Sequence, residues 1–147
     1  MREILFRGKT IKQNNGVTTE KPIKENMWVY GNLTVGRIEG YKCDMISNKK
    51  EIYYINSETV GQFTGLTDKN GKKIFEGDIV RVKITQSEDI KTYGNCKYKV
   101  GFIVYNEDFA LFTCKNNFMN FINWAFNDYE VIGNIHDNPE LLQEQDK

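Results

Sequence analysis

Apolar and polar side chains alternate along several short stretches of this sequence, and this two-residue period constrains the fold more than any other feature. In the run 79–84 the valines and the final isoleucine fall on one side, while Arg81 and Lys83 fall on the other. Residues 98–104 alternate in the same way, with the apolar positions 98, 100, 102 and 104 on one side. Such a period is typical of strands that bury one face and expose the other to water. The sequence therefore predicts a mainly β protein.

The first half, residues 1–66, is predicted as an added region of β-hairpins. A short strand at 3–7 leads into a polar arm at about 8–26. The run 27–37 is predicted as a hairpin that turns at Gly31-Asn32, and Asn48-Lys49-Lys50 separates a second pair of strands. Gly and Asn favour turns because they tolerate backbone angles that other residues avoid.

Residues 74–136 are predicted as a small five-stranded barrel of the SH3-like type. Asn70-Gly71 favours a tight primed turn before it. A hairpin turns at 106–108, a last strand covers 129–135, and Asn138 with Pro139 begins a short C-terminal helix. For 118–126 the period favours neither a strand nor a helical turn, and both stay open.

Composition limits the compartment and the class of protein. The chain of 147 residues suits one ordinary domain, and its 20 basic and 20 acidic residues balance. No apolar run reaches the roughly 18–20 residues that span a bilayer, and the N-terminus lacks a signal-peptide pattern. The cysteines Cys43, Cys96 and Cys114 are odd in number and widely spaced, which favours reduced thiols over disulfides or zinc ligands. We expect a cytoplasmic protein without membrane contact.

Six segments of the sequence, which together span essentially the whole chain, 1–147, resemble the YopX family. Their order and spacing carry the resemblance more than any single string does. They are Met1 to Arg7, Trp28 to Gly31, Val60 to Leu66, Asp68 to Gly71, Ile74 to Val80, and Tyr129 to Leu141.

The resemblance implies provenance more than chemistry. Proteins of this family are encoded by phages and prophages, chiefly those infecting Gram-positive bacteria, and the family carries no established activity. No catalytic residue can therefore be carried over to a position here. The resemblance implies a phage or prophage accessory protein in the cytoplasm of the host bacterial cell.

The segment 65–77 resembles two kinds of ligand-binding loop, and each comparison fails at positions that the ligand requires. A phosphate-binding loop has four residues between its first glycine and the Gly-Lys pair, then Ser or Thr. Here five residues separate Gly65 from Gly71, and Lys73 stands in the Ser/Thr position. Aligned as a calcium-binding EF-hand, the loop puts Leu66 and Gly77 where carboxylate ligands are required. Neither a nucleotide nor a metal site is predicted, and no cofactor is expected.

Few residues are suited to acid–base catalysis. His136 is the only histidine, and no G-x-S-x-G elbow accompanies it. Glu76 and Asp78 flank Gly77, and we expect Asp78 to accept hydrogen bonds from backbone N–H groups where the strand begins. The sequence thus favours a protein that is not an enzyme. An enzyme without a recognisable motif would need His136, Glu76 and Asp78 in one cleft.

Binding is the function that the sequence favours. Lysines crowd the turn before the barrel, and further cations alternate on the two strands after it. The candidate nucleic-acid face consists of Lys69, Lys72, Lys73, Arg81, Lys83, Lys97 and Lys99. Small barrels can hold phosphates with lysines while aromatic side chains stack bases. The alternative is that these cations serve only solubility and edge protection.

A protein partner is the other form that binding can take. The aromatic share of 13% and the strand edges suit pairing between like chains. We therefore expect a homo-oligomer, or a contact with a phage or host protein.

Overall fold

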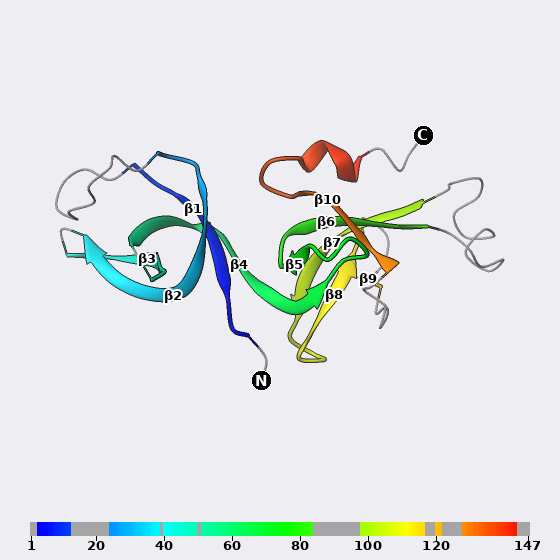
Figure 1. The fold of residues 1–147 in the computed structure, drawn as a ribbon, viewed down its shortest axis with the longest axis horizontal. Coiled ribbons are helices and arrows are strands. Elements are labelled where there is room, and N and C mark those ends of the chain that lie inside the picture. The colour runs from blue at the N-terminus through cyan, green and yellow to red at the C-terminus, as the bar shows by residue number, and fades with distance from the viewer. Residues whose placement is uncertain are drawn as a thin grey trace. The chain divides into compact units, whose positions relative to one another are not determined.

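The computed structural model describes residues 3–12, 24–38, 40–49, 51–83, 98–116, 120–121 and 128–143. The chain is mainly β, as the alternation predicts, and divides into two compact units, Met1–Phe63 and Thr64–Lys147. Figure 1 traces the strands of both units in chain order. Each unit is described by itself.

The first unit is a four-stranded barrel closed by its own first strand. β1 (Phe6–Thr10) pairs antiparallel with β2 (Trp28–Ile38) and also with β4 (Ile52–Thr67), while β3 (Tyr41–Ser47) lies between β2 and β4. Because β1 has a partner on both sides, the ring of strands has no break. Its core consists of Val29, Ile46, Tyr53 and Ile55.

The prediction of a hairpin at Gly31-Asn32 is wrong, because β2 runs through both residues as one strand. Gly31 is there for a different reason. A Cβ atom at Gly31 would lie 2.1 Å from the backbone oxygen of Ser47 on β3. The glycine therefore permits a close approach of two backbones rather than a turn. The second predicted turn is confirmed, since residues 48–51 separate β3 from β4.

The second unit contains the five-stranded sheet β10-β6-β7-β8-β9. Its strands are β6 (Asp78–Lys83), β7 (Tyr98–Asn106), β8 (Leu111–Lys115), β9 (Asn120–Phe121) and β10 (Glu130–Asn134). The short β5 (Lys73–Phe75) pairs instead with the end of β4. Strand pairing thus closes a ring in the first unit, where only hairpins were expected. The SH3-like assignment of 74–136 stays a prediction.

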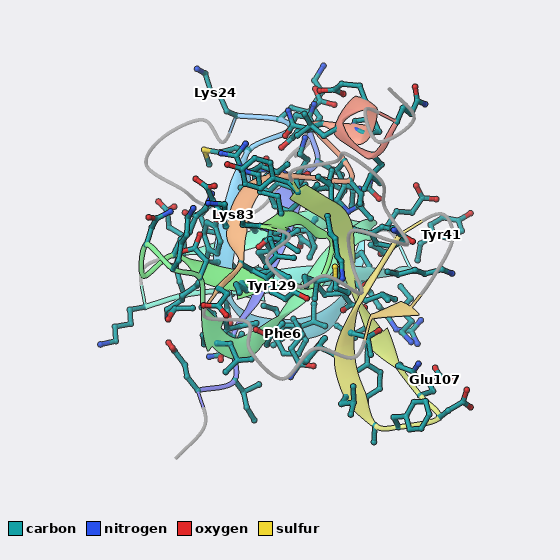
Figure 2. The ribbon with its side chains drawn as sticks, turned by 90° about the vertical axis from the view of Figure 1, so that its right-hand side faces the viewer. Phe6, Lys24, Tyr41, Lys83, Glu107 and Tyr129 are labelled. Atoms are coloured by element: carbon teal, nitrogen blue, oxygen red, sulfur yellow. The ribbon has the colours of Figure 1, made fainter. Side chains whose placement is uncertain are left out.

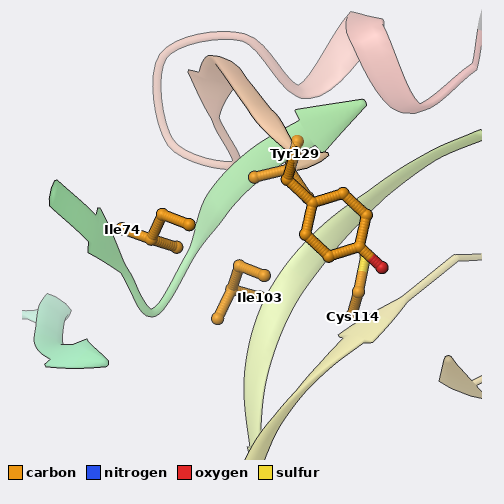
Figure 3. Close-up of a cluster of buried hydrophobic side chains, with 5 residues drawn as sticks. Ile74, Ile103, Cys114 and Tyr129 are labelled. Atoms are coloured by element: carbon orange, nitrogen blue, oxygen red, sulfur yellow. The ribbon is translucent and has the colours of Figure 1, made fainter. Parts of the chain in front are cut away.

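One face of this sheet makes the core of the second unit. Ile74, Val80, Ile103, Cys114 and Tyr129 are all nearly inaccessible to solvent and pack together (Figure 3). Val80 and Val82 point to this side, as their alternation predicts. On β7 the expected face is wrong, because the residue that enters this core is Ile103 and not its neighbours at 102 and 104.

The chain end confirms the predicted helix in position and corrects its type. Pro139–Leu142 forms a 3-10 helix, η2, with Asn138 at the N-cap and Pro139 in the first turn. The Asn138 side chain makes no capping hydrogen bond within η2, and its Oδ1 instead accepts the N–H of Asn134 at 3.4 Å. Cys43 and Cys114 are free thiols, as expected, while Cys96 lies outside the described residues.

The polar arm and the ambiguous run lie largely outside the described part of the chain. β1 continues to Thr10, so the strand extends past the predicted start of the arm at 8. Of 118–126, only Asn120–Phe121 is described, and it is a strand paired with β8.

Candidate nucleic-acid interface

The hairpin between β4 and β5 carries three of the predicted cations, Lys69, Lys72 and Lys73. The N–H of Gly71 donates to the carbonyl of Asp68 at 3.0 Å, and the N–H of Asp68 donates to the carbonyl of Lys72 at 2.8 Å. Gly71 has φ of +80°, whereas Asn70 is not among the residues with positive φ. This is a three-residue loop with one left-handed glycine, not the primed two-residue turn that was predicted. The turn itself is confirmed.

The side chain of Asp68 stabilises this hairpin through hydrogen bonds to its backbone. Its buried carboxylate accepts the N–H groups of Asn70 at 2.8 Å and Lys72 at 2.9 Å through Oδ1. Oδ2 accepts the N–H of Val131 on β10 at 3.0 Å. Burial pushes the pKa of Asp68 upward, but the three backbone donors and the charge of Lys72 outweigh it, so the pKa lies below its ordinary value. Asp68 is thus a structural carboxylate rather than a metal ligand.

Glu130 joins two of the predicted cations. Its Oε2 lies 3.1 Å from Lys69 Nζ and 2.7 Å from Arg81 Nε. The hydrogen bonds from Arg81 and then from Lys69 hold the pKa of Glu130 below its ordinary value. One acid therefore offsets part of the positive charge on this face. Sequence reasoning missed Glu130, although its place on the polar side of the predicted last strand was a usable signal.

The register of β6 and β7 decides which cations share a face. Arg81 is opposite Val100, and Lys83 is opposite Tyr98, so these side chains lie on the outer side of the sheet. The guanidinium of Arg81 sits over the Tyr98 ring, 5.1 Å from its centroid. Tyr98 is 43% exposed. An accessible aromatic ring thus has two cations beside it.

Lys99 does not join this group. It is opposite Val82, so it belongs to the side of the sheet that faces the core. The prediction of one shared face assumed that Lys99 alternates in step with Arg81 and Lys83, and the register is shifted by one residue from that assumption. Lys97 lies outside the described residues.

The outer basic face therefore contains fewer residues than predicted. It consists of Lys69, Arg81, Lys83, Tyr98 and Glu130. Lys72 and Lys73 are exposed on the neighbouring hairpin. The three cations and one acid leave an excess of two positive charges on the face.

Two of the candidate catalytic residues, Asp78 and His136, lie beside the turn at Gly77. Gly77 has φ of +83°, and Asp78 accepts the N–H of Phe75 at 2.8 Å through Oδ2, which confirms the predicted local role of Asp78. His136 lies close by, since a Cβ atom at Gly77 would be 3.7 Å from its Nε2. The carboxylate of Asp78 is almost fully buried. Asp78 therefore has a structural role, since a buried carboxylate needs a hydrogen-bond donor and the Phe75 N–H supplies one.

Within the described ranges, no three or more His, Cys, Asp or Glu side chains gather as metal ligands would. In the same ranges, no helix has the length and apolar character needed to cross a membrane.

Comparison with known proteins finds a matching family and similar solved structures. A family model described as "YopX protein" matches residues 6–143. One of these structures is titled "Crystal structure of protein EF1440 from Enterococcus faecalis", and its sequence is 24% identical to this chain. The match covers 97% of this chain and 99% of that chain, with a TM-score of 0.47. A search of curated proteins finds no match.

Proposed function

The chain belongs to the YopX family, and from this membership we propose that it is a phage or prophage accessory protein that acts by binding, without catalysis, in the cytoplasm of the host cell. The roles of the acids support this proposal. Asp68 and Asp78, which lie in the segments that most resemble catalytic or ligand loops, are engaged by backbone N–H groups. Both therefore shape turns.

The ligand class that the geometry favours is single-stranded nucleic acid. The observation that carries it is Tyr98, an accessible ring with the Arg81 guanidinium over it and Lys83 opposite it in register. Proteins that bind single strands pair aromatic rings, which stack on bases, with cations that contact phosphates. The outer basic face has both kinds of group.

The strand order of the second sheet is compatible with this use. The four consecutive strands β6, β7, β8 and β9 form a meander, and β10 returns to pair with β6. This is the order of an SH3-like barrel, so we retain that assignment for residues 74–136. In this arrangement the outer basic face lies on β6, β7 and β10, and Lys69 joins it from the β4–β5 hairpin.

A gel-retardation assay with a labelled oligothymidylate, at low and at higher salt, tests the proposal. Binding that weakens steeply as salt rises is expected, because each neutralised phosphate releases counterions. Absence of a shift at low salt would remove nucleic acid as the ligand and leave a protein partner as the mode of binding.

Association with a second copy of the chain is the other candidate, and one surface favours it. At the tip of the β7–β8 hairpin, where Figure 2 labels Glu107, Phe109 is 60% exposed. Tyr105 is also exposed and packs edge-to-face on Phe112, with ring centroids 5.3 Å apart. Aromatic side chains are enriched in the cores of interfaces. Light scattering tests this: a particle of 17.2 kDa would exclude a stable dimer.

A further inference from the structure

We propose that the first unit carries its own single-strand nucleic-acid site, on the outer side of β1 and β2. The site consists of Arg7, Lys9, Trp28 and Tyr30, with Lys12 and Lys24 at its border; we call it the β1–β2 strip. This inference rests on the proposed function and extends it to a second surface, none of whose residues belongs to the outer basic face.

Strand pairing places the aromatic and basic side chains of the strip together. Arg7 is opposite Tyr30, and Lys9 is opposite Trp28. The residues between them, Gly8 and Val29, face the barrel core. Alternation therefore puts all four strip residues on the outer side of the sheet.

The cations lie over the indole ring of Trp28. The guanidinium carbon of Arg7 is 4.7 Å from the ring centroid, and Nζ of Lys9 is 5.4 Å from it. Arg7 is only 6% exposed, so it orients the indole and adds positive potential rather than contacting a phosphate. Lys9 and Trp28 are partly accessible, and Tyr30 is 46% exposed. Tyr30 is thus the main stacking surface, with Trp28 beside it.

A turn fastened to Thr10 fixes the start of β2. The backbone of Thr10 exchanges hydrogen bonds with Asn26 at 2.8 Å and Met27 at 3.0 Å. Its hydroxyl donates to the carbonyl of Lys24 at 2.5 Å and accepts the N–H of Met27 at 3.0 Å. Because Thr10 is buried, these bonds hold residues 24–27 firmly. The Lys24 side chain extends away from the ribbon in Figure 2.

Charge complementarity identifies the occupant as a polyanion. Residues 7–12 contain three cations and no acid, while 24–30 contain one lysine and one glutamate. The two segments that contain the strip and its border therefore have a net charge of +3, in a chain whose overall charge is zero. A polyanion without bases would use the lysines alone and leave the rings unoccupied.

The spacing of the rings favours a single strand over a duplex. Trp28 and Tyr30 are two residues apart on one strand, or roughly 6.8 Å at about 3.4 Å per residue. That is about twice the rise between stacked bases in a duplex, so neighbouring bases must be unstacked to meet both rings. Only a flexible single strand offers such bases without disruption of base pairs.

The test uses Trp28 as its own reporter. The chain has two tryptophans, so the Trp124→Phe variant leaves Trp28 as the only one. We expect a short oligothymidylate to quench its fluorescence, and a duplex of equal length to bind several-fold more weakly. In the otherwise unchanged chain, Tyr30→Ala should lower the affinity for a labelled oligothymidylate at least about 5-fold. Tyr41→Ala is the matched control, because Tyr41 is 79% exposed in the same unit but lies at the far end of β2–β3.

Lys83→Ala, on the outer basic face, separates this inference from the proposed function. If Lys83→Ala weakens binding while Tyr30→Ala and the Trp28 signal are unchanged, the β1–β2 strip is excluded and the proposed function stands. If only Tyr30→Ala weakens binding, the strip is the site and the outer basic face is not. Equal affinity for the duplex overturns the single-strand assignment. No binding to the unmodified chain overturns both proposals.

Discussion

Asp68 and Val131 are 63 residues apart in the chain, and the carboxylate of the first accepts the backbone N–H of the second at 3.0 Å. The same carboxylate closes the hairpin that carries Lys69. Lys69 is also tied to β10 by its own N–H, which donates to the carbonyl of Tyr129 at 2.9 Å. One buried acid therefore couples a surface turn to an edge strand of the sheet.

Replacement of this acid should lower stability. In Asp68→Asn one carboxylate oxygen becomes an NH2 group, which faces a backbone donor instead of accepting from it. We expect the free energy of unfolding to fall by about 1–3 kcal/mol, measured by urea denaturation. Asp108→Asn, in the exposed β7–β8 turn, is the control and should change stability by no more than about 0.5 kcal/mol. Equal effects of the two substitutions would contradict the role assigned to Asp68.

Acid should destabilise the fold through the same groups. The pKa values of Asp68 and Glu130 are lower in the folded chain than in the unfolded one. Their contribution is therefore complete above the unfolded values of about 3.9 and 4.3, and is lost as pH falls through the folded values. Urea midpoints measured across this range should decline, and the decline should be shallower in Asp68→Asn. A variant curve parallel to that of the unmodified chain would show that Asp68 does not contribute.

Opposite substitutions on the outer basic face should change nucleic-acid affinity in opposite directions. Glu130→Gln removes the acid that pairs with Lys69 and Arg81, so binding of oligothymidylate should tighten by a few-fold. Lys83→Ala should weaken it and reduce the slope of log K against log salt by about 0.7. Lys42→Ala, at an exposed site on β3, provides the control for a lost lysine. Weaker binding by Glu130→Gln would argue against this face.

Gly31→Ala should be far more damaging than Gly40→Ala. The new Cβ at Gly31 would collide with the backbone of Ser47, whereas at Gly40 no atom lies within 4 Å and only the φ of +87° opposes it. We expect a loss of about 3 kcal/mol at Gly31 and about 1 kcal/mol at Gly40, from thermal or urea unfolding. Comparable losses would mean that β2 and β3 do not approach as closely as described.

The turns were predictable because single residues determine them. Gly77 and Asp78 give the step into β6, residues 48–51 separate β3 from β4, and Pro139 marks the start of η2. These features depend on the φ preferences of single residues and on hydrogen bonds between residues close in sequence, so the residue types alone predict them. At Gly31 the same logic failed, since a glycine needed for close packing resembles a glycine needed for a turn.

The faces of β7 were less predictable, because apolar residues occupy both of its sides. Ile103 faces one core, yet Phe102 is also partly buried and is paired with Ile79, which is inaccessible on the other side of β6. Because neither side of β7 is polar, the sequence pattern fits equally well when the strand is shifted by one residue against β6. Because of that shift, Lys99 was assigned to the outer face of the sheet, and the candidate nucleic-acid face was predicted to be larger than it is. Closure of the first unit was equally hidden, since pairing of β1 with β4 joins residues about 50 positions apart.

Because Cys114 lies in the core, its chemical modification can report how often the second unit opens. Burial raises the pKa of this thiol to about 12, so at neutral pH almost none of it is the reactive thiolate. An alkylating reagent can modify Cys114 only in molecules whose sheet has separated. The rate at which its mass label accumulates therefore counts those rare events, without any denaturant being added.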